Sequence, residues 1–326
     1  MGEPEIKWTA ELEQAIIRKT ELKFDARRIR EASYRPFTKR FLYYDRVIIH
    51  RLYQQDSIFP IDHNVENTVI AFSDVGSRTD YCVFASNRLA DLHFGAAVDA
   101  YQQVPRYRFS GSERIDNVTD WALEQFRAHF RTGNSNTRPI TKDAIFHYVY
   151  AVLQDPAYRE RYALNLKRVF PRIPFYGDFW RWADWGERLM TLHTGYETVE
   201  PWPLARVDIP DERSRKVGLL PKPLLRADET IGSIILDTET QLRGIPKTAW
   251  DYRLGNRSAL EWILDQHRER KPKDPTIRER FNTYRLADYK EKVIDLLMRV
   301  TRVSVETMKI VAAMKARTGL TRDASI

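Results

Sequence analysis

The sequence of 326 residues contains a single cysteine, Cys82. One cysteine excludes an internal disulfide and any zinc site built from several cysteines, and it is typical of a protein from a reducing cytoplasm. Cys82 stands in the apolar run YCVFAS. A small buried strand residue is the expected role there, ahead of a catalytic thiol.

Long apolar runs are also missing. No window approaches the roughly 18 apolar residues of a membrane-spanning helix, and the acidic start MGEPEIKWTAELEQ lacks the apolar core of a secretory signal. We therefore expect a cytoplasmic location and no membrane partner. The abrupt start is also compatible with a segment of a longer polypeptide.

The motifs of several enzyme classes are absent from the sequence. We find no GxxxxGK phosphate loop, no GxGxxG turn, no HExxH helix and no GxSxG elbow. The nearest match to the Pro-Pro motif of amino-methyltransferases is DPAY at 155–158, which has one proline and stands between two predicted helices. The seven histidines show no metal-ligand spacing, which favours structural roles. These absences favour a binding protein without a cofactor of its own, although an enzyme of unrecognised type stays open.

Basic residues are in excess. The chain has 53 Lys plus Arg against 45 Asp plus Glu, a formal charge of +8 and a pI near 9.4. Residues 268–326 hold 15 Lys plus Arg against 8 Asp plus Glu, so most of the excess lies near the end of the chain. This balance favours a polyanionic partner such as nucleic acid, with a merely basic protein as the alternative.

The order of β-prone and helix-prone segments predicts an α+β fold with a β-rich N-terminal part, a helical middle, a small β hairpin and a helical C-terminal tail. The apolar content of 43% is enough for a core. The predicted segments are a surface helix at 9–31, short strands within 40–94, helices within 118–196 that begin near Asn117 and Thr141, a loop at 200–230, a hairpin at 230–245 and helix in 268–326.

Several long motifs follow one another in the order found in a known family. They are YRPF with RFLYYD at 34–45, YAVLQDPAYRERY at 150–162, FPRIP at 170–174, LMTLH at 189–193 and WDYRLGNRSALEWILDQH at 250–267. With these motifs the chain resembles the carboxy-terminal region of type ISP restriction-modification enzymes. Thr38 departs from the usual YRPFD of that family.

The resemblance implies a target recognition domain that reads double-stranded DNA in phage defence. In that family one polypeptide also carries a nuclease, a translocase and an N6-adenine methyltransferase that uses S-adenosylmethionine. We accordingly expect a helical connector to the methyltransferase at 1–32, the recognition domain at 33–255 and a helical C-terminal segment at 256–326. A protein-interaction scaffold within a phage-defence complex is the alternative function.

Two sets of residues are candidates for DNA contact. Arg35, Lys39 and Arg40 in YRPFTKRFLYYD suit phosphate contacts, although the same stretch also suits a half-buried strand whose Arg35 pairs with an acid. Because family members recognise different sequences, the base-reading residues are expected between the shared motifs. The candidates there are Arg78, Arg106, Arg108, Asn134, Asn136 and Arg243, since Arg can pair with guanine and Asn with adenine.

Overall fold

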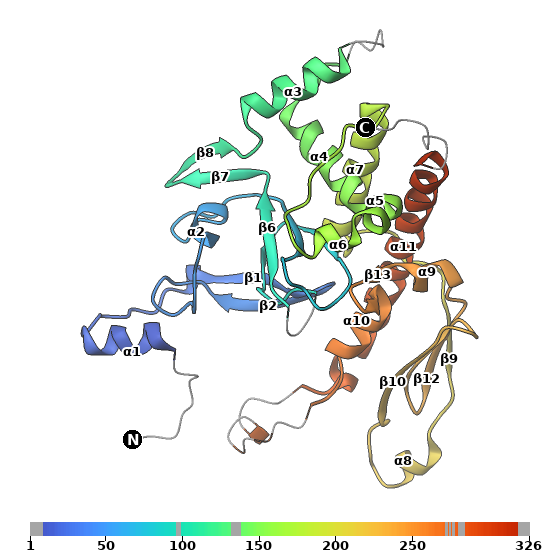
Figure 1. Ribbon diagram of the computed structural model, residues 1–326. Helices are drawn as coiled ribbons and strands as arrows, with labels where there is room; N and C mark the ends of the chain where they lie inside the picture. The colour runs from blue at the N-terminus through green and yellow to red at the C-terminus, as the bar shows by residue number, and fades with distance from the viewer. Residues whose placement is uncertain are drawn as a thin grey trace.

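The computed structural model of the protein describes residues 9–95, 99–131, 138–270, 273, 275, 278–279 and 284–318. Within these residues the fold is α+β, as the sequence predicts (Figure 1). Three small sheets and a projecting two-stranded ribbon are packed around a group of helices.

The first sheet contains β2 (Thr38–Tyr43), β1 (Ile29–Arg35) and β5 (Leu89–Ala90), in that order. The prediction of one helix over 9–31 is wrong beyond its first part. Helix α1 (Ala10–Ile17), capped by Thr9, ends before Lys19, whose φ is 53°. The chain then enters β1, because pairing with β2 satisfies its backbone groups better than an isolated helix with a weak apolar face.

The second sheet lies in the order β4-β3-β6, with β3 (Val69–Ser73) between β4 (Val83–Ser86) and β6 (Tyr101–Pro105). All residues of β3 and β4 are buried, and so is Cys82, as its apolar context predicts. The short helix α2 (Gln55–Ile58) precedes this sheet. The chain leaves β6 into a ribbon of β7 (Tyr107–Ser110) and β8 (Glu113–Asp116), which projects from the body of the molecule (Figure 1).

The predicted helical middle is present as five helices. They are α3 (Asp120–Phe130), α4 (Lys142–Gln154), α5 (Pro156–Arg161), α6 (Ala163–Leu166) and α7 (Phe179–Thr194). Thr141 caps α4 as predicted, with its hydroxyl accepting from the Ala144 N–H. The cap of α3 is Thr119 and not Asn117, whose amide donates to the carbonyl of Pro105 instead.

Helices α4 and α7 pack at very short range through a glycine. A Cβ placed on Gly186 of α7 would overlap the backbone carbonyl of His147 on α4. A backbone carbonyl cannot swing aside as a flexible side chain can, so the contact between these helices requires glycine at this position.

The predicted hairpin is present as β11 (Ser233–Asp237) and β12 (Thr240–Arg243), but it is the centre of a larger sheet. Strands β9 (Ala205–Asp208) and β10 (Pro223–Asp228) extend it to the order β10-β11-β12-β9. Both strands fall in the predicted loop, where helix α8 (Glu212–Lys216) also lies. Their sequences give little β signal because their pairing partner is supplied by the hairpin.

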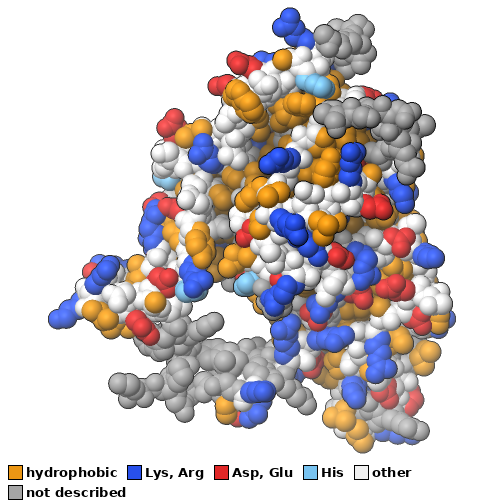
Figure 2. All heavy atoms as spheres, in the orientation of Figure 1, with side chains coloured by type: hydrophobic (Ala, Val, Ile, Leu, Met, Phe, Trp, Pro, Cys, Tyr) orange, Lys and Arg blue, Asp and Glu red, His pale blue; other side chains and the backbone are white. Residues whose placement is uncertain are grey.

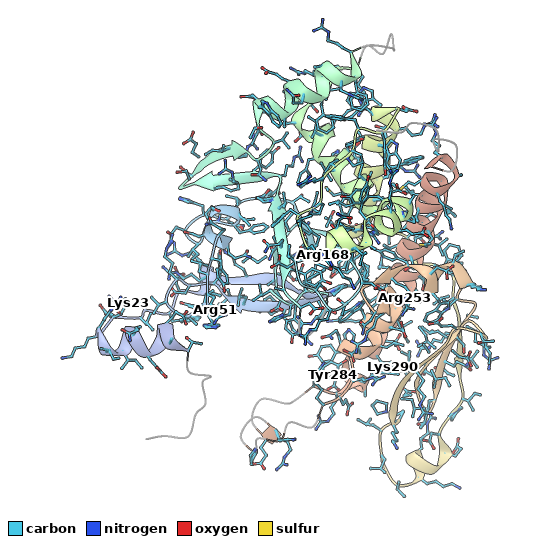
Figure 3. All side chains as sticks on the ribbon, viewed as in Figure 1. Lys23, Arg51, Arg168, Arg253, Tyr284 and Lys290 are labelled. Carbon is cyan, nitrogen blue, oxygen red and sulfur yellow. The ribbon has the colours of Figure 1, made fainter. Side chains whose placement is uncertain are left out.

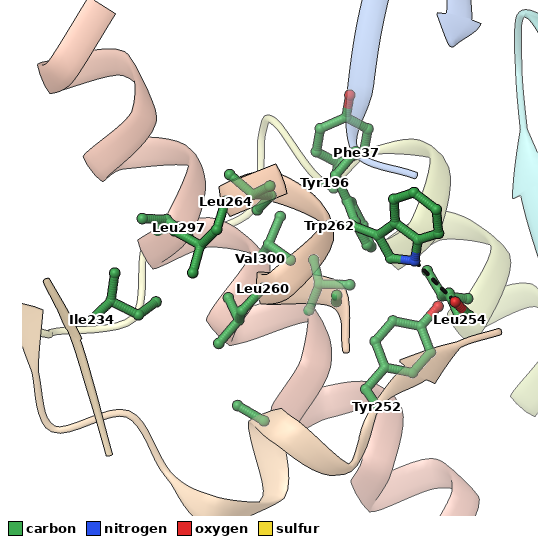
Figure 4. Packing of buried hydrophobic residues seen from close by; sticks show 14 of the residues in the cluster. Phe37, Tyr196, Ile234, Tyr252, Leu254, Leu260, Trp262, Leu264, Leu297 and Val300 are labelled. Carbon is green, nitrogen blue, oxygen red and sulfur yellow. Dashed lines mark hydrogen bonds between the residues drawn. The ribbon is translucent and has the colours of Figure 1, made fainter. Parts of the chain in front are cut away.

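The C-terminal part joins the whole molecule together. It contains α9 (Lys247–Asp251), the short strands β13 (Arg253–Leu254) and β14 (Arg257–Ser258), α10 (Ala259–Gln266) and the 33-residue helix α11 (Leu286–Thr318). In Figure 4, Leu297 and Val300 of α11 lie beside Leu260 and Leu264 of α10, close to Phe37 from the first sheet. Further along α11, Ile310 and Met314 belong to the core built by α4 and α7.

Packing is therefore continuous across residues 32 and 255, where the sequence suggested domain boundaries. Strand β1 runs through residue 32, and α10 and α11 share a core with the four-stranded sheet. The division into connector, recognition domain and C-terminal segment stays a prediction about function, because neither boundary separates two independent cores.

A fully buried histidine connects the elements at the centre of the molecule. His193 on α7 bonds through Nδ1 to the hydroxyl of Tyr150 on α4 at 2.5 Å, and through Nε2 to Thr307 of α11 at 2.9 Å and Tyr252 at 3.1 Å. The Tyr150 hydroxyl in turn accepts from the Ala85 N–H of β4. Burial, with a smaller effect of Arg159, lowers the pKa of His193 from 6.5 to about 3. The imidazole is therefore neutral at pH 7, and the structural role predicted for the histidines holds at this one.

We predict that His193 makes folding sensitive to mild acid. Its folded pKa lies below its unfolded value, so the unfolded chain binds the proton that the folded chain excludes. The free energy of unfolding is then unaffected above pH 6.5 and falls by up to about 1.4 kcal/mol per pH unit below it. Urea denaturation at pH 7, 6 and 5 measures the slope. His193→Gln should make it shallower without abolishing it, because burial also lowers the pKa of His267 and of His147. His63→Gln, at an exposed position, serves as the control. An unchanged slope in His193→Gln would contradict this account.

We also predict that Gly186→Ala strongly destabilises the protein although alanine favours helix. The added methyl group must displace the backbone of α4, and overpacking of this kind costs about 1–3 kcal/mol or more. Gly177→Ala is a matched control, since nothing lies within 4 Å of a Cβ at that position. Thermal unfolding of both variants measures the difference, and equal melting temperatures would contradict the prediction.

Candidate nucleic-acid interface

The motif YRPFTKRFLYYD forms the end of β1, the tight turn that follows it, and β2. Phe37 occupies the turn with a φ of 56° and is only 2% exposed. Its ring meets those of Phe84 and Tyr196 edge-on, each at 5.2 Å. The turn is therefore anchored in the core by its aromatic side chain, and Thr38 beside it is also buried. Asp45, the acid of the motif, pairs with Arg28 and is buried as well.

Two of the three predicted phosphate contacts are already neutralised within the protein. Arg35 pairs with Asp91 at 2.8 Å, lies over the Tyr34 ring and has a side chain that is 12% exposed. Lys39 pairs with Glu197 and Glu31, and its side chain is 15% exposed. This arrangement is the structural alternative that the sequence left open for Arg35. Both side chains hold elements of the fold together, which leaves them poorly placed for phosphate.

Arg40 differs from both. Its side chain is exposed, and it forms no ion pair or hydrogen bond with any residue that the structure describes. It lies close enough to His267 and Tyr284 to influence their pKa values, and those two side chains bond to each other at 2.9 Å. Burial first, and then the charge of Arg40, lower the pKa of His267 to about 4. With the exposed Arg268 and Arg285, these residues form what we call the Arg40 surface.

Tyr284 of the Arg40 surface lies at the border of an indentation of the molecule (Figures 2 and 3). Figure 2 shows that the surface is hollowed between the part that carries α1 and the part that carries the four-stranded sheet, and Lys and Arg side chains gather along its inner border. Lys23 and Arg51 lie on one side of this hollow, with Tyr284 on the other (Figure 3). Lys290, beyond Tyr284, already pairs with the buried Asp237. Aromatic and basic side chains together suit contact with a nucleic acid backbone and its bases.

The predicted base-reading residues do not lie in one place. Arg78 belongs to a turn held by the buried Asp99, to which it donates through its N–H and its Nε. Burial raises the pKa of Asp99, but hydrogen bonds from Thr79, Ser77 and Arg78 outweigh burial and hold it at about 2. The Arg78 side chain is still 71% exposed, so its end is accessible.

Arg106 and Arg243 have partners of their own. Arg106 pairs through two nitrogens with Asp143 of α4, which ties the start of the ribbon to the helices. Arg243, at the end of β12, bonds to Gln241 two residues earlier and is exposed. Asn134 and Asn136 lie outside the described residues.

Arg108 is the predicted reader that the structure leaves most available. It projects from β7, is exposed and pairs with no described acid. The facing strand adds Arg114, which the sequence did not single out although it lies in the same stretch, VPRYRFSGSER. The guanidinium of Arg114 lies over the Tyr107 ring at 4.5 Å. The run 161–172 adds further exposed cations that the sequence reasoning passed over, namely Arg161, Lys167, Arg168 and Arg172.

A cavity of about 800 Å³ is lined by cations that already have partners. They are Arg27, Arg28, Arg30 and Arg88. Arg30 is held by the carbonyls of Pro60, Ile61 and His63, and the other three each pair with an acid.

Within the described ranges, no group of three or more His, Cys, Asp or Glu is placed to hold a metal ion. No helix described here is both long and apolar enough to cross a membrane.

Comparison with known proteins identifies the class of domain. Residues 2–296 match the Type ISP C-terminal specificity domain family, and the chain belongs to this family. The resemblance inferred from the motifs is therefore confirmed. No curated protein sequence matches the chain.

Solved structures of similar chains agree with this assignment. A cryo-EM structure of a DrdV–DNA complex is 44% identical, with a TM-score of 0.88 over 96% of this chain and 31% of that one. LlaGI, a Type ISP restriction-modification enzyme solved as a nuclease-deletion mutant with a DNA substrate mimic, is 27% identical, with a TM-score of 0.72 over 94% of this chain and 26% of that one. The ATP-dependent Type ISP enzyme LlaBIII, bound to DNA, shares the fold at 22% identity and a TM-score of 0.76, over 95% and 20%. The chain spans less than a third of each of these proteins.

We predict unequal effects of two nearby arginines on stability. Arg35→Ala leaves Asp91 without its partner and should lower the free energy of unfolding by about 1–3 kcal/mol. Arg40→Ala removes an exposed side chain and should change it by less than about 0.5 kcal/mol. Urea denaturation at pH 7 compares the two, and equal effects would contradict the assignment.

Proposed function

We propose that this chain recognises a specific sequence in double-stranded DNA as the specificity part of a Type ISP restriction-modification enzyme. The observation that carries the proposal is the match to DrdV, which extends over 96% of this chain at 44% identity and comes from a complex with DNA. The family assignment and the basic Arg40 surface support the same conclusion.

In this proposal the chain itself performs no chemistry. It holds a duplex in place for an N6-adenine methyltransferase of the same polypeptide, which would bind S-adenosylmethionine, and the translocase and nuclease parts act on the same DNA. The setting is phage defence in the cytoplasm. The fold supports this division of roles, because α11 contributes to both large cores and so joins the elements into one packed platform for DNA.

A salt-dependent mobility shift tests DNA binding directly. Phosphate contacts release counterions, so affinity should fall as salt rises. A protein-interaction scaffold would bind DNA weakly or not at all in this assay. An enzyme of unrecognised type is tested by incubating the chain with DNA and S-adenosylmethionine, where methyl transfer by the chain alone would contradict the proposal.

We predict that Arg40→Ala weakens binding about equally on all DNA sequences. If Arg40 contacts one phosphate, the slope of log affinity against log salt should become shallower by about 0.9. Arg46→Ala is the matched control, because Arg46 is half-exposed but already pairs with Asp56 and Asp62. Arg40→Lys should retain most of the affinity, since it keeps the charge. An unchanged slope in Arg40→Ala would exclude Arg40 from the phosphate contacts.

A further inference from the structure

The ribbon formed by β7 and β8 is rigid at its base and uncovered toward its tip. Asn67, which is 5% exposed, donates to the Tyr107 carbonyl at 2.8 Å and accepts from the Tyr107 N–H at 3.2 Å. Arg106 pairs with Asp143, and Lys142 pairs with Asp116 at the other strand. The two strands are thus fixed to the body of the molecule where they begin and end.

Within the described residues, the outer strand β8 has no covering layer, whereas β7 lies against α2. All four residues of β8 are exposed, and β7 alternates between half-buried and exposed. The turn passes through Gly111, whose φ is 62° and around which nothing lies within 4 Å of a Cβ position. A two-stranded ribbon is marginally stable by itself, so the anchored base is what keeps the tip in position. In Figure 1, β7 lies beside α2, and β8 is the outer strand of the ribbon.

The pairing register assigns the side chains of the ribbon to two faces. Arg108 is opposite Ile115, and Ser110 is opposite Glu113, so these four residues share one face. Tyr107, Phe109, Arg114 and Asp116 share the other, where Arg114 is stacked on Tyr107 and Asp116 is paired with Lys142. On the first face, no ion pair joins Arg108 to Glu113 or to any other described acid.

The first face has the chemistry of a major-groove reader. The major groove of B-DNA admits a two-stranded ribbon. An arginine there can bond to guanine O6 and N7, and a glutamate can accept from cytosine N4. Arg108 and Glu113 supply these two groups on one face of an element whose base is anchored by Asn67 and by two ion pairs. Arg114 is held flat against an aromatic ring on the opposite face.

We propose that the β7–β8 ribbon enters the major groove with its Arg108 face, and that Arg108 selects a guanine in the recognition sequence. Glu113 contributes by accepting from a neighbouring cytosine. This inference rests on the proposed function, because it requires that the chain binds duplex DNA, and it specifies which element reads the bases.

Selection from a library of duplexes with a randomised central segment tests the inference without knowledge of the target. The chain is mixed with the library, bound duplexes are recovered and sequenced over several rounds, and the enriched motif is compared between variants. Arg108→Ala should reduce the preference for guanine at one position by about tenfold or more, and the rest of the motif should persist. Arg108→Gln should shift that position toward adenine, which glutamine pairs with.

Arg114→Ala is the matched control, an arginine of the same ribbon on the opposite face, and it should retain the wild-type motif. Thermal unfolding confirms that each variant is folded. If Arg108→Ala enriches the wild-type motif, or if Arg114→Ala loses a base position instead, the inference is overturned while the proposed function stands. If the wild-type chain enriches no motif at all, both the inference and the proposed function fail.

Discussion

The buried imidazole of His193 is the constraint on which the arrangement of the other elements depends. It accepts or donates at both ring nitrogens, and through Tyr150, Tyr252 and Thr307 it connects α4, α7, the segment after α9 and α11. The Tyr150 hydroxyl accepts from the Ala85 N–H, and in the tautomer in which it donates to Nδ1, the Nε2–H donates to Thr307 or Tyr252. A neutral ring with both nitrogens bonded can be buried at little cost, whereas a protonated ring could not.

This centre explains why the C-terminal helix cannot be regarded as an appendage. Thr307 lies on α11 between residues that pack with the four-stranded sheet and residues that pack with α4 and α7. Because α11 packs in both cores, the Arg40 surface and the ribbon belong to one packed body. A platform of this kind can hold a duplex in a fixed register, which specific recognition requires.

The cations divide into those that maintain the fold and those that remain available. An acid partner within the protein neutralises the charge of each of Arg35, Lys39 and Arg106. Arg40 and Arg108 are exposed and have no acid partner in the part of the chain described. Net charge alone does not distinguish the two groups, because both contribute equally to the excess of +8.

The sequence by itself determined the α+β composition, the buried strand around Cys82, the cap at Thr141 and the presence of helix in the last segment, because each depends on neighbours within a few residues. The family motifs were equally readable, since they are local strings. Only the tertiary structure decided that Arg35 meets Asp91, 56 residues away, that Lys39 meets Glu197, 158 residues away, and that β9 and β10 complete a sheet. Partners so distant along the chain leave no periodicity or spacing in the sequence, and they are brought together by burial of the core between them.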